Sequence, residues 1–591
     1  MPNSLLESRS EFDHKKALLG QWLRDNIRST GTLSRDQLKD TYGEHKFIAG
    51  WSVELEPCGT PARFDVLIDG RFPYSPIRVS YRSQEVYLKW PHVEPGGLLC
   101  LPRRAAPTAG IEPAILGALQ DSRVLVERCQ DPKFIETELQ HEFVSYWNRS
   151  QNKGANPVRS LLEPTNTRCR SIAVWYGENY TLAGENSDEL LGWLENSGRK
   201  DPSKIAAGVF AYLDHPPAPP FPDRPADLFA LLQTHAPDAL SLLERVPVNE
   251  KVTVVLGASS PSGDGLISLT VSIPRDFDGF RKSSRNNLHT KLALWKVKSG
   301  LTRREIKRYD AAWIHGRGRN KYQPALRAAN ALLLGCGSLG SQVAFRLAQS
   351  GLGGLVLVDP DELSTANVGR HSLGIDSVGL HKATALANAL RRHFPHLRRI
   401  EGYPISWQML YERQPSIFTE ATLIVACLGD WSEDGQLSEW QAREHRFPAI
   451  VYGWLDEFGV AAHAVALTPT SPGLGCILDP DGALRIPESL WEGDGLVQAE
   501  PACGTLFQPY GPIDVAHAEA LTSRLCIELL TGIIQPPRHR VYAGSTAQLN
   551  EAGGEWSPHH LKFRPQGFDG AFEYERPIMA CGQCLACLER F

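Results

Sequence analysis

Residues 331–349 read ALLLGCGSLGSQVAFRLAQ, and this stretch decides the fold of the C-terminal half of the chain. An apolar run of strand length leads into the turn Gly335-Cys336-Gly337-Ser338-Leu339-Gly340, which opens a helical pattern. Glycines at such a turn permit a tight bend and let backbone N–H groups at the helix N-terminus approach a phosphate. Asp359 ends the next strand-like run, where an acid can hold a ribose hydroxyl. Taken alone, these residues fit a nicotinamide or flavin enzyme, and also a turn that serves only packing.

Strand-like and helical patterns alternate through residues 301–591. ALLLG precedes a helix expected at 340–350, LVLVD precedes one at 381–393, and the strand-like runs TLIVACLG and AIVYGW follow. Such alternation predicts a parallel sheet of doubly wound type. We therefore expect a Rossmann-like C-terminal domain.

Two further blocks precede this one. Residues 1–150 run in the order helix, strands, long irregular stretch and helices, which predicts an α+β domain. A polar stretch around residue 151, NRSQNKGANPVRS, is typical of a linker. Residues 165–300 mix strand and helix patterns without a chemical motif. They predict a central α/β linker or docking domain.

Composition excludes several classes of protein. The chain has 591 residues, of which 42% are hydrophobic and 22% charged, and this excludes wholesale disorder. A net charge of -5 argues against direct nucleic-acid binding. Neither a signal-peptide core nor a run of about 18 apolar residues occurs, so no membrane association is expected. The 12 cysteines cluster only at the C-terminus, as is typical of a reducing compartment, and we expect a cytoplasmic protein.

The residues after the glycine turn carry a family resemblance. LVLVDPDELSTANVGRH, a lysine on the next helix and the aspartate of IVACLGDW together resemble the ThiF/MoeB/E1 adenylation family over roughly residues 301–545. The resemblance implies that ATP and Mg²⁺ are used to transfer AMP to a carboxylate. The implied nucleotide-site residues are Gly335, Gly337, Gly340, Asp359, Asp361, Asn367, Arg370 and Lys382, with Asp430 as the catalytic aspartate.

Charge supports this assignment, because adenylation brings two anions together. Arg370 and Lys382 can neutralise phosphate charge, and Asp430 can hold Mg²⁺. The resemblance also implies a homodimer formed through this domain, in which an arginine upstream of the glycine turn reaches the partner's site. Arg308 in KRYD and Arg317 are both candidates, and the sequence does not choose between them.

E1-type enzymes often pass the acyl group to a cysteine. A thiolate that attacks an acyl-adenylate releases AMP and keeps the carboxylate activated as a thioester. Cys503 lies in a loop before a helix expected at about 514–530, as the resemblance requires, although a buried structural cysteine is the alternative. Cys526, Cys336 and Cys427 fall on apolar faces and are expected to serve packing.

The C-terminal tail MACGQCLACLERF places Cys581, Cys584 and Cys587 at Cys-x-x-Cys-x-x-Cys spacing. Such spacing lets thiolates converge on one tetrahedral Zn²⁺. The family often uses two Cys-x-x-Cys pairs, whereas this chain has only Cys476 in the loop that matches the first pair. One plus three still supplies four ligands, so we expect a structural zinc site. A redox-active or disordered tail is the alternative.

A second resemblance lies in the first block. FPYSPIRVSY followed by WPHVEPGGLLCLP resembles the ubiquitin-conjugating (E2) core over about residues 40–150, with Pro73, Pro76, Gly97 and Cys100 in register. His92 stands eight residues before Cys100, where the E2 pattern has an asparagine. A histidine there can donate a hydrogen bond to an oxyanion, act as a base, or only cap the loop. Cys100 is the implied catalytic cysteine, and a non-catalytic binding module is the alternative.

An E2-like domain, a linker domain and an E1-like domain in one chain resemble the bacterial E1–E2 fusions of CBASS antiphage operons. The resemblance implies activation of a C-terminal glycine carboxylate, transfer from Cys503 to Cys100, and conjugation to a target amine. The activated protein is then the cGAS-like nucleotidyltransferase of the operon or a separate ubiquitin-like protein, and a JAB-family deconjugase is the expected neighbour.

Two other classes of protein are weighed against this interpretation. One is a nucleotide-binding scaffold whose E2-like domain only binds, and a pyrophosphate-exchange assay distinguishes it from an adenylating enzyme. The other is an NAD-dependent oxidoreductase, which the set Arg370, Lys382 and Asp430 disfavours.

Overall fold

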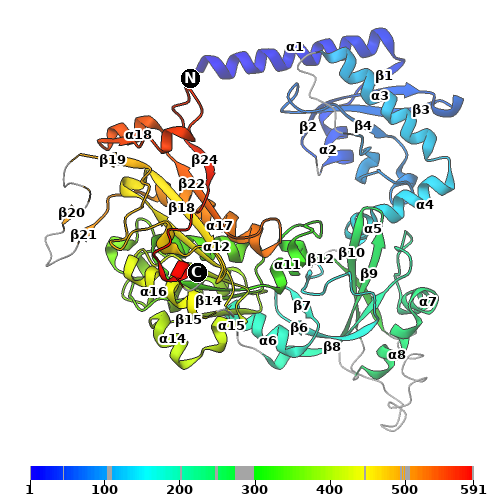
Figure 1. Ribbon diagram of the computed structural model, residues 1–591. Coiled ribbons are helices and arrows are strands. Elements are labelled where there is room, and N and C mark those ends of the chain that lie inside the picture. Colours follow the sequence, from blue (N-terminus) through cyan, green and yellow to red (C-terminus); the bar gives the residue numbers. More distant parts are fainter. Residues whose placement is uncertain are drawn as a thin grey trace. The chain divides into compact units, whose positions relative to one another are not determined.

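The computed structural model describes the chain except residues 1, 44, 103–109, 153, 200–201, 247–250, 273–298, 445–446, 493–495, 497, 500–505 and 589–591. It divides into two compact units, Met1–Asn186 with Lys204–Lys307, and Ser187–Ser203 with Arg308–Phe591. The first unit holds the N-terminal and middle domains. The second holds the C-terminal domain together with helix α6 (Ser187–Asn196) (Figure 1).

The N-terminal domain is a four-stranded antiparallel sheet in the order β1-β2-β3-β4, packed against helices. Alternate strand residues such as Trp51, Val53, Phe64 and Val66 enter one apolar core, as the two-residue period of a half-buried strand requires. The elements are α1 (Pro2–Asn26), β1 (Ser29–Thr32), α2 (Arg35–Tyr42), β2 (Phe47–Leu55), β3 (Ala62–Asp69), β4 (Arg78–Tyr81), α3 (Ile111–Arg128), α4 (Pro132–His141) and α5 (Phe143–Ser150).

The middle domain is an eight-stranded mixed sheet in the order β11-β10-β9-β8-β6-β7-β5-β12. Helices α7 and α8 contribute Leu228, Leu232 and Leu243 to the core on one of its faces. The elements are β5 (Val158–Ser160), β6 (Arg170–Tyr176), β7 (Thr181–Gly184), β8 (Ile205–Tyr212), α7 (Pro225–His235), α8 (Pro237–Arg245), β9 (Lys251–Ser260), β10 (Gly263–Ser272), β11 (Gly300–Arg304) and β12 (Ile306–Arg308).

Helix α5 belongs to the core of the middle domain. Phe143, Tyr146 and Trp147 are buried together with apolar residues of β8, β9 and β10. The Trp147 indole N–H donates to the Arg304 carbonyl oxygen at 3.0 Å, and a Cβ on Gly265 would lie 2.6 Å from the Phe143 ring. The last helices of the N-terminal block are therefore fixed by the sheet that follows them in sequence.

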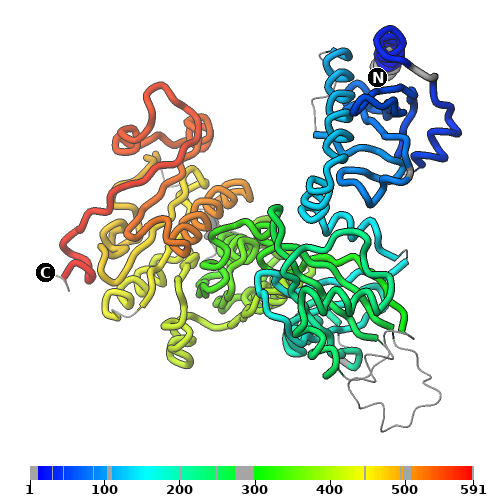
Figure 2. The backbone as a smooth tube through the Cα atoms, turned by 90° about the vertical axis from the view of Figure 1, so that its right-hand side faces the viewer, coloured from blue at the N-terminus to red at the C-terminus, as the bar shows by residue number. Residues whose placement is uncertain are grey.

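The C-terminal domain is an eight-stranded sheet in the order β15-β14-β13-β16-β17-β18-β22-β24. The first five strands are parallel, which confirms the predicted sheet type, and the last three are antiparallel additions. In Figure 2 the last strand, drawn in red, runs beside the orange strand β22. The strands are β13 (Asn330–Leu334), β14 (Gly354–Val358), β15 (Arg399–Tyr403), β16 (Leu423–Ala426), β17 (Ile450–Leu455), β18 (Ala461–Leu467), β22 (Arg538–Ala543) and β24 (Phe572–Arg576).

Helices cover both faces of this sheet. Ala331 and Leu333 of β13 pack with α12, α13 and α17, whereas Leu332 and Leu334 pack with α14, α15 and α16. Successive residues of β13 thus enter opposite cores, which makes the strand continuously apolar. The main helices are α12 (Ser338–Gln349), α13 (Lys382–His393), α14 (Trp407–Arg413), α15 (Ser416–Glu420), α16 (Trp431–Arg443) and α17 (Pro512–Leu530). Smaller elements are α10 (Ala311–Ile314), α11 (Gln323–Ala328), β19 (Ser489–Trp491), β20 (Gln498–Ala499), β21 (Leu506–Phe507), α18 (Thr546–Glu551), β23 (Gly554–Trp556) and α19 (Leu585–Leu588).

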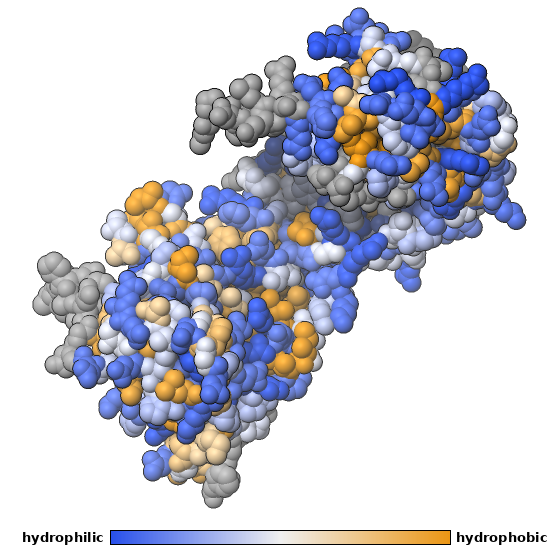
Figure 3. Space-filling model, turned by 90° about the horizontal axis from the view of Figure 1, so that it is seen from above, coloured by the Kyte–Doolittle hydropathy of each residue, from blue (hydrophilic) through white to orange (hydrophobic). Residues whose placement is uncertain are grey.

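The surface drawn in Figure 3 is mainly hydrophilic, and its hydrophobic residues form small separate groups. None of the described helices combines the length and apolarity that crossing a bilayer requires.

Candidate functional site

At two positions of the turn between β13 and α12, a side chain larger than that of glycine would collide with the backbone. Gly335 has φ +86°, and a Cβ there would lie 2.4 Å from the Cys427 carbonyl oxygen. A Cβ on Gly340 would lie 1.8 Å from the Gly335 carbonyl oxygen. Around Gly337, by contrast, no described atom beyond its neighbours in the chain lies within 4 Å of the position that a Cβ would take. The turn is therefore closed against the sheet and open at Gly337, where the N-terminus of α12 begins.

Asp359 holds the turn in place from the end of β14. Its side chain is buried, and its carboxylate accepts the N–H of Cys336 at 2.6 Å and the N–H of Asp361 at 2.8 Å. Burial raises the pKa of Asp359 above its ordinary value, although these two bonds oppose the rise. Each oxygen keeps a lone pair, so the carboxylate can still accept a hydroxyl.

The predicted cationic residues lie on the same side of the domain as the turn. Lys382 Nζ is 2.9 Å from Asp361 Oδ2, and the lysine side chain is largely buried. The Arg370 guanidinium lies 4.7 Å from the centroid of the Tyr510 ring, and the Tyr510 hydroxyl is 3.2 Å from Ser338 Oγ in the first turn of α12. Arg370 is thus linked through Tyr510 to the N-terminus of α12.

Asn367 has a local structural partner. Its side-chain oxygen accepts the backbone N–H and the hydroxyl of Ser364, each at 3.0 Å, and so caps the short helix Thr365–Asn367. This cap shapes the segment that presents Arg370.

Asp430 caps helix α16 at the end of β16. Its carboxylate accepts the hydroxyl and the backbone N–H of Ser432 and the N–H of Glu433, and these bonds lower the pKa of Asp430. Asp434 stands one helical turn further on. Burial and the nearby charges of Asp430 and Glu433 raise the pKa of Asp434 to about 7. Its Oδ1 is buried and has no hydrogen-bond partner among the described residues.

A cavity of about 690 Å³ opens beside Gly337 and Ser338 and extends past Asp430 and Asp434. Its described lining contains no lysine, arginine or histidine. The acidic lining residues are Asp430, Asp434, Asp456, Glu457, Asp481 and Glu488, and the aromatic ones are Trp431, Tyr452, Trp454, Trp491 and Tyr510. Such a chamber accepts an anionic nucleotide only together with cations, and carboxylates are the ligands that Mg²⁺ prefers.

Two of these acids contact a buried polar network behind the cavity wall. Asp456 Oδ2 lies 3.1 Å from Nε2 of the fully buried His463. Glu488 contacts His560 Nδ1 at 2.9 Å and is also paired with Tyr574 and Arg576. Burial raises the pKa of Glu488, but these partners outweigh it and lower the pKa to about 2.

Sequence reasoning found Asp430 and missed the other acids of the cavity. Asp434 could have been predicted from the sequence, because it follows Asp430 by four residues and residues four apart lie on the same face of a helix. The remaining acids come from segments far apart in sequence, and only the folded sheet brings them together.

The two candidate arginines have different surroundings. Arg308 donates to both oxygens of Asp310 at 2.8 Å and lies 4.8 Å from the centroid of the Trp313 ring, with its side chain about 10% exposed. Arg317 is exposed and has φ +51°.

The N-terminal domain brings Cys100 and His92 together. The Cys100 N–H donates to the His92 carbonyl oxygen at 2.8 Å, and a bridge pairs Val93 with Leu99 between them. Cys100 is exposed. Gly97 makes the bend possible, because it has φ +75° and a Cβ there would lie 2.1 Å from the Tyr81 carbonyl oxygen.

His92 is held in a left-handed backbone conformation with φ +58°, which costs a non-glycine residue on the order of 1 kcal/mol. Its N–H donates to the Tyr146 hydroxyl at 2.8 Å. A side-chain hydrogen bond with Cys100 raises the pKa of His92. Burial opposes the rise, and the carboxylates of Glu142 and Glu138 add to it.

Two family models match the chain. The ThiF family matches residues 311–482, and Prokaryotic E2 family B matches residues 28–155. The chain joins a ThiF-type domain to an E2-type domain. Between them they cover the glycine turn, Asp430, His92 and Cys100.

Two curated relatives of the chain carry the name Cap2. The ATP-dependent ubiquitin transferase-like protein Cap2 of Enterobacter hormaechei subsp. hoffmannii is 29% identical over 32% of this chain and 31% of its own length. The Cap2 protein of Pseudomonas aeruginosa is 25% identical over 36% of this chain and 38% of its own. The chain thus spans about a third of the length of these curated relatives. Among solved structures, E. coli MccB with MccA-N7isoASN aligns with 45% of this chain and 69% of its own at 17% identity and a TM-score of 0.32.

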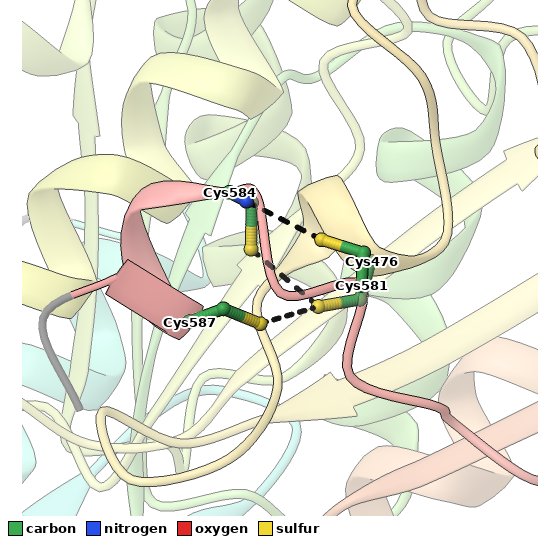
Figure 4. A group of neighbouring side chains, drawn as sticks. All are labelled: Cys476, Cys581, Cys584 and Cys587. Atoms are coloured by element: carbon green, nitrogen blue, oxygen red, sulfur yellow. Dashed lines mark hydrogen bonds between the residues drawn. The ribbon is translucent and has the colours of Figure 1, made fainter. Parts of the chain in front are cut away.

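Four cysteines converge beside the ThiF-type domain. Cys476 ends the short helix Leu474–Cys476, and Cys581, Cys584 and Cys587 come from the C-terminal tail (Figure 4). All four sulfurs lie within 4.8 Å of one another, and Cys476 Sγ is 3.4 Å from Sγ of both Cys584 and Cys587. Tetrahedral Zn²⁺ with bonds of about 2.3 Å separates sulfurs by roughly 3.8 Å, so this donor set fits zinc.

The other cysteines of the ThiF-type domain fall into two groups. Cys336, Cys427 and Cys526 are buried in its core, which confirms the predicted packing role. Cys503 lies outside the described residues. The helix predicted to follow it is α17, whose N-terminal residue is Pro512.

Proposed function

We propose that this protein is an ATP-dependent E1–E2 transferase. The ThiF-type domain adenylates a C-terminal glycine carboxylate, the acyl group passes to Cys503 and then to Cys100, and the E2-type domain conjugates it to a target amine. The observation that carries the proposal is the acidic cavity that opens at Gly337, because it combines a phosphate-binding helix N-terminus with carboxylates suited to a metal.

The residues of the ThiF-type domain have complementary roles in adenylation. Backbone N–H groups at the start of α12 bind phosphate oxygens. Arg370 and Lys382, which lie outside the described cavity lining, offset the phosphate charge from beside the turn. Asp430 and Asp434 would hold Mg²⁺, which supplies neutralising charge to the phosphates. The substrate carboxylate oxygen attacks the α-phosphorus of ATP, the bond to the β-phosphate oxygen breaks, and pyrophosphate leaves.

Thiol chemistry carries the acyl group onward. The Cys503 thiolate attacks the acyl-adenylate carbonyl, and AMP leaves. The Cys100 thiolate then attacks the Cys503 thioester, and Cys503 leaves as a thiolate. An amine finally displaces Cys100. The exposure of Cys100 supports its role as the second acceptor.

The partners follow from the same proposal. The acyl donor is the C-terminus of a cGAS-like nucleotidyltransferase or of a ubiquitin-like protein, in an antiphage operon that also encodes a JAB-family deconjugase. The protein works in the cytoplasm as a homodimer through its ThiF-type domain. Because Arg308 is paired with Asp310 in its own chain, the exposed Arg317 is the better candidate to reach the partner's nucleotide. A structural Zn²⁺ at the four cysteines ties the tail to the domain.

ATP–pyrophosphate exchange tests the proposal, with the C-terminal twenty residues of the neighbouring nucleotidyltransferase or ubiquitin-like protein as the probe. We expect exchange by the wild-type chain and a loss of at least 100-fold in Asp430→Asn, because the lost charge removes several kcal/mol of stabilisation. Asp376→Asn, an exposed aspartate outside the cavity lining, is the matched control and retains exchange. Wild-type exchange by Asp430→Asn contradicts the proposal.

A further inference from the structure

Two carboxylates of the E2-type domain converge on the histidine beside the exposed cysteine. Glu138 of α4 places Oε2 3.1 Å from His92 Nε2, and Glu142 places Oε2 3.8 Å from His92 Nδ1. His92 and Glu138 are each about 22% exposed, whereas Glu142 is 45% exposed. Glu138 is therefore both the closer and the more shielded of the two.

The contact with Glu138 selects the tautomer of His92. An ionised carboxylate only accepts hydrogen bonds, so Nε2 carries a proton that it donates to Glu138. Nδ1 is then the ring nitrogen left to exchange a proton with the thiol of Cys100, whose backbone N–H donates to the His92 carbonyl oxygen at 2.8 Å.

The middle domain fixes this arrangement. Helix α5 is anchored by Phe143 and Trp147 in the core that the sheet of the middle domain provides, and Tyr146 of the same helix accepts the His92 N–H. The Ser260 hydroxyl at the end of β9 donates to the His141 carbonyl oxygen at 3.2 Å, at the end of α4. The helices that carry Glu138 and Tyr146 are thus held by elements outside the E2-type sheet.

We propose that Cys100, His92 and Glu138 form a thiol–imidazole–carboxylate relay, in which His92 is catalytic and Glu138 is the positioning residue. This relay rests on the proposed transferase function and adds to it a residue that orients the base. It also gives the middle domain a role, because that domain holds the carboxylate in place.

The relay balances in both steps. The Cys100 S–H proton moves to His92 Nδ1, and the resulting thiolate attacks the donor thioester, so that one S–C bond forms and the other breaks. The departing Cys503 thiolate takes the proton from the imidazolium, which returns His92 to its neutral form. In the second step the amine nitrogen forms a bond to the acyl carbon, and its proton moves to neutral His92. The S–C bond then breaks, and the Cys100 thiolate takes the proton back from the imidazolium.

The charges around His92 and Cys100 decide whether Glu138 favours or opposes formation of the Cys100 thiolate. The groups that face His92 are Cys100, Glu138, Glu142 and the Tyr146 hydroxyl, and the Arg149 guanidinium lies 5.9 Å from the centroid of the Tyr146 ring. The Glu138 carboxylate stabilises an imidazolium at His92, which it contacts directly, and repels a thiolate at Cys100, which lies beyond the imidazole ring. Because Coulomb energy falls with distance, the direct contact with His92 dominates, and Glu138 favours the thiolate–imidazolium pair.

Site-resolved alkylation of Cys100 by iodoacetamide in the full chain tests the relay without ATP or an acyl donor. We expect Glu138→Gln, which keeps a hydrogen-bond acceptor but loses the charge, to move the midpoint of the alkylation profile up by about one pH unit. The alkylation rate at pH 7 then falls roughly tenfold. Glu136→Gln is the matched control, since Glu136 is an exposed residue of the same helix, and its profile stays at the wild-type midpoint.

An unchanged midpoint in Glu138→Gln, a shift to lower pH, or an equal shift in Glu136→Gln overturns the relay. If Glu138→Gln lowers the melting temperature, the comparison moves to Glu142→Gln, for which the relay requires a smaller shift in the same direction. Pyrophosphate exchange is measured in the same variants and stays at the wild-type rate. Exchange that is absent in every variant, with the alkylation shift present, would refute the transferase function and leave the relay intact.

Discussion

Asp430 and Asp434 show how neighbouring residues of one type acquire different properties. Asp430 receives hydrogen bonds from the first turn of α16, so it is ionised over the physiological range. Asp434 is buried next to that charge, and its pKa rises to about 7. A divalent cation between the two would offset both the burial and the repulsion. The pair is therefore a candidate metal site.

The glycines of the turn give a prediction at the same scale. Gly340→Ala places a Cβ 1.8 Å from a backbone oxygen, and we expect it to destabilise the ThiF-type domain by about 1–3 kcal/mol or more. Gly337→Ala has open space and φ -74°, so it keeps the wild-type melting temperature and weakens ATP binding instead. Thermal unfolding and nucleotide titration measure the two effects. A destabilised Gly337→Ala, or a fully stable Gly340→Ala, would refute this steric account.

At the scale of elements, the C-terminal tail depends on a contact between segments more than a hundred residues apart. Glycines of the SPGLGC loop let it approach, since a Cβ on Gly475 would lie 2.9 Å from Cys584 Cβ. The tail has few other described apolar anchors besides Ala586 and Cys587, both of which are buried. A metal that joins both segments would supply the missing stabilisation.

We therefore predict about one zinc per chain by elemental analysis. Cys476→Ser removes a ligand from the buried side of the cluster, so we expect zinc to fall below a tenth of that content and the melting temperature of the domain to drop. Cys58→Ser, an exposed cysteine of the E2-type domain, is the control and retains the metal. Purified wild-type protein that is folded, active and free of zinc would rule out the site.

The elements also show which parts of the site the sequence could predict. The glycine turn, Asp430 and the pair His92 and Cys100 lie in short local patterns, because a strand-to-helix turn and a tight loop are specified by adjacent residues. Glu138 comes 46 residues after His92, on helix α4, whose Leu139 is buried in the core of the middle domain, so the contact depends on tertiary packing. The three antiparallel strands at the edge of the C-terminal sheet were not predicted for a similar reason, since their pairing depends on contacts across most of the domain.

On the scale of the whole molecule, the two cysteines proposed to carry the acyl group lie in different units of the chain. In the proposed mechanism acyl-adenylate forms at the ThiF-type domain, so we expect the first thiol to belong to that domain. Exchange between two thioesters is nearly isoenergetic, and ATP consumption upstream supplies the driving force. The proposed order, Cys503 then Cys100, thus requires both domains in one chain.

Trapping the thioesters tests this order most directly. The full chain is incubated with ATP, Mg²⁺ and the acyl donor, and adducts sensitive to reducing agent are assigned to a cysteine by mass spectrometry. Cys100→Ala is predicted to accumulate the adduct on Cys503, whereas Cys503→Ala is predicted to form adenylate without any adduct on Cys100. Cys58→Ala should behave like the wild-type chain. A Cys503→Ala protein that still loads Cys100 would contradict the two-cysteine relay and show direct transfer from the adenylate.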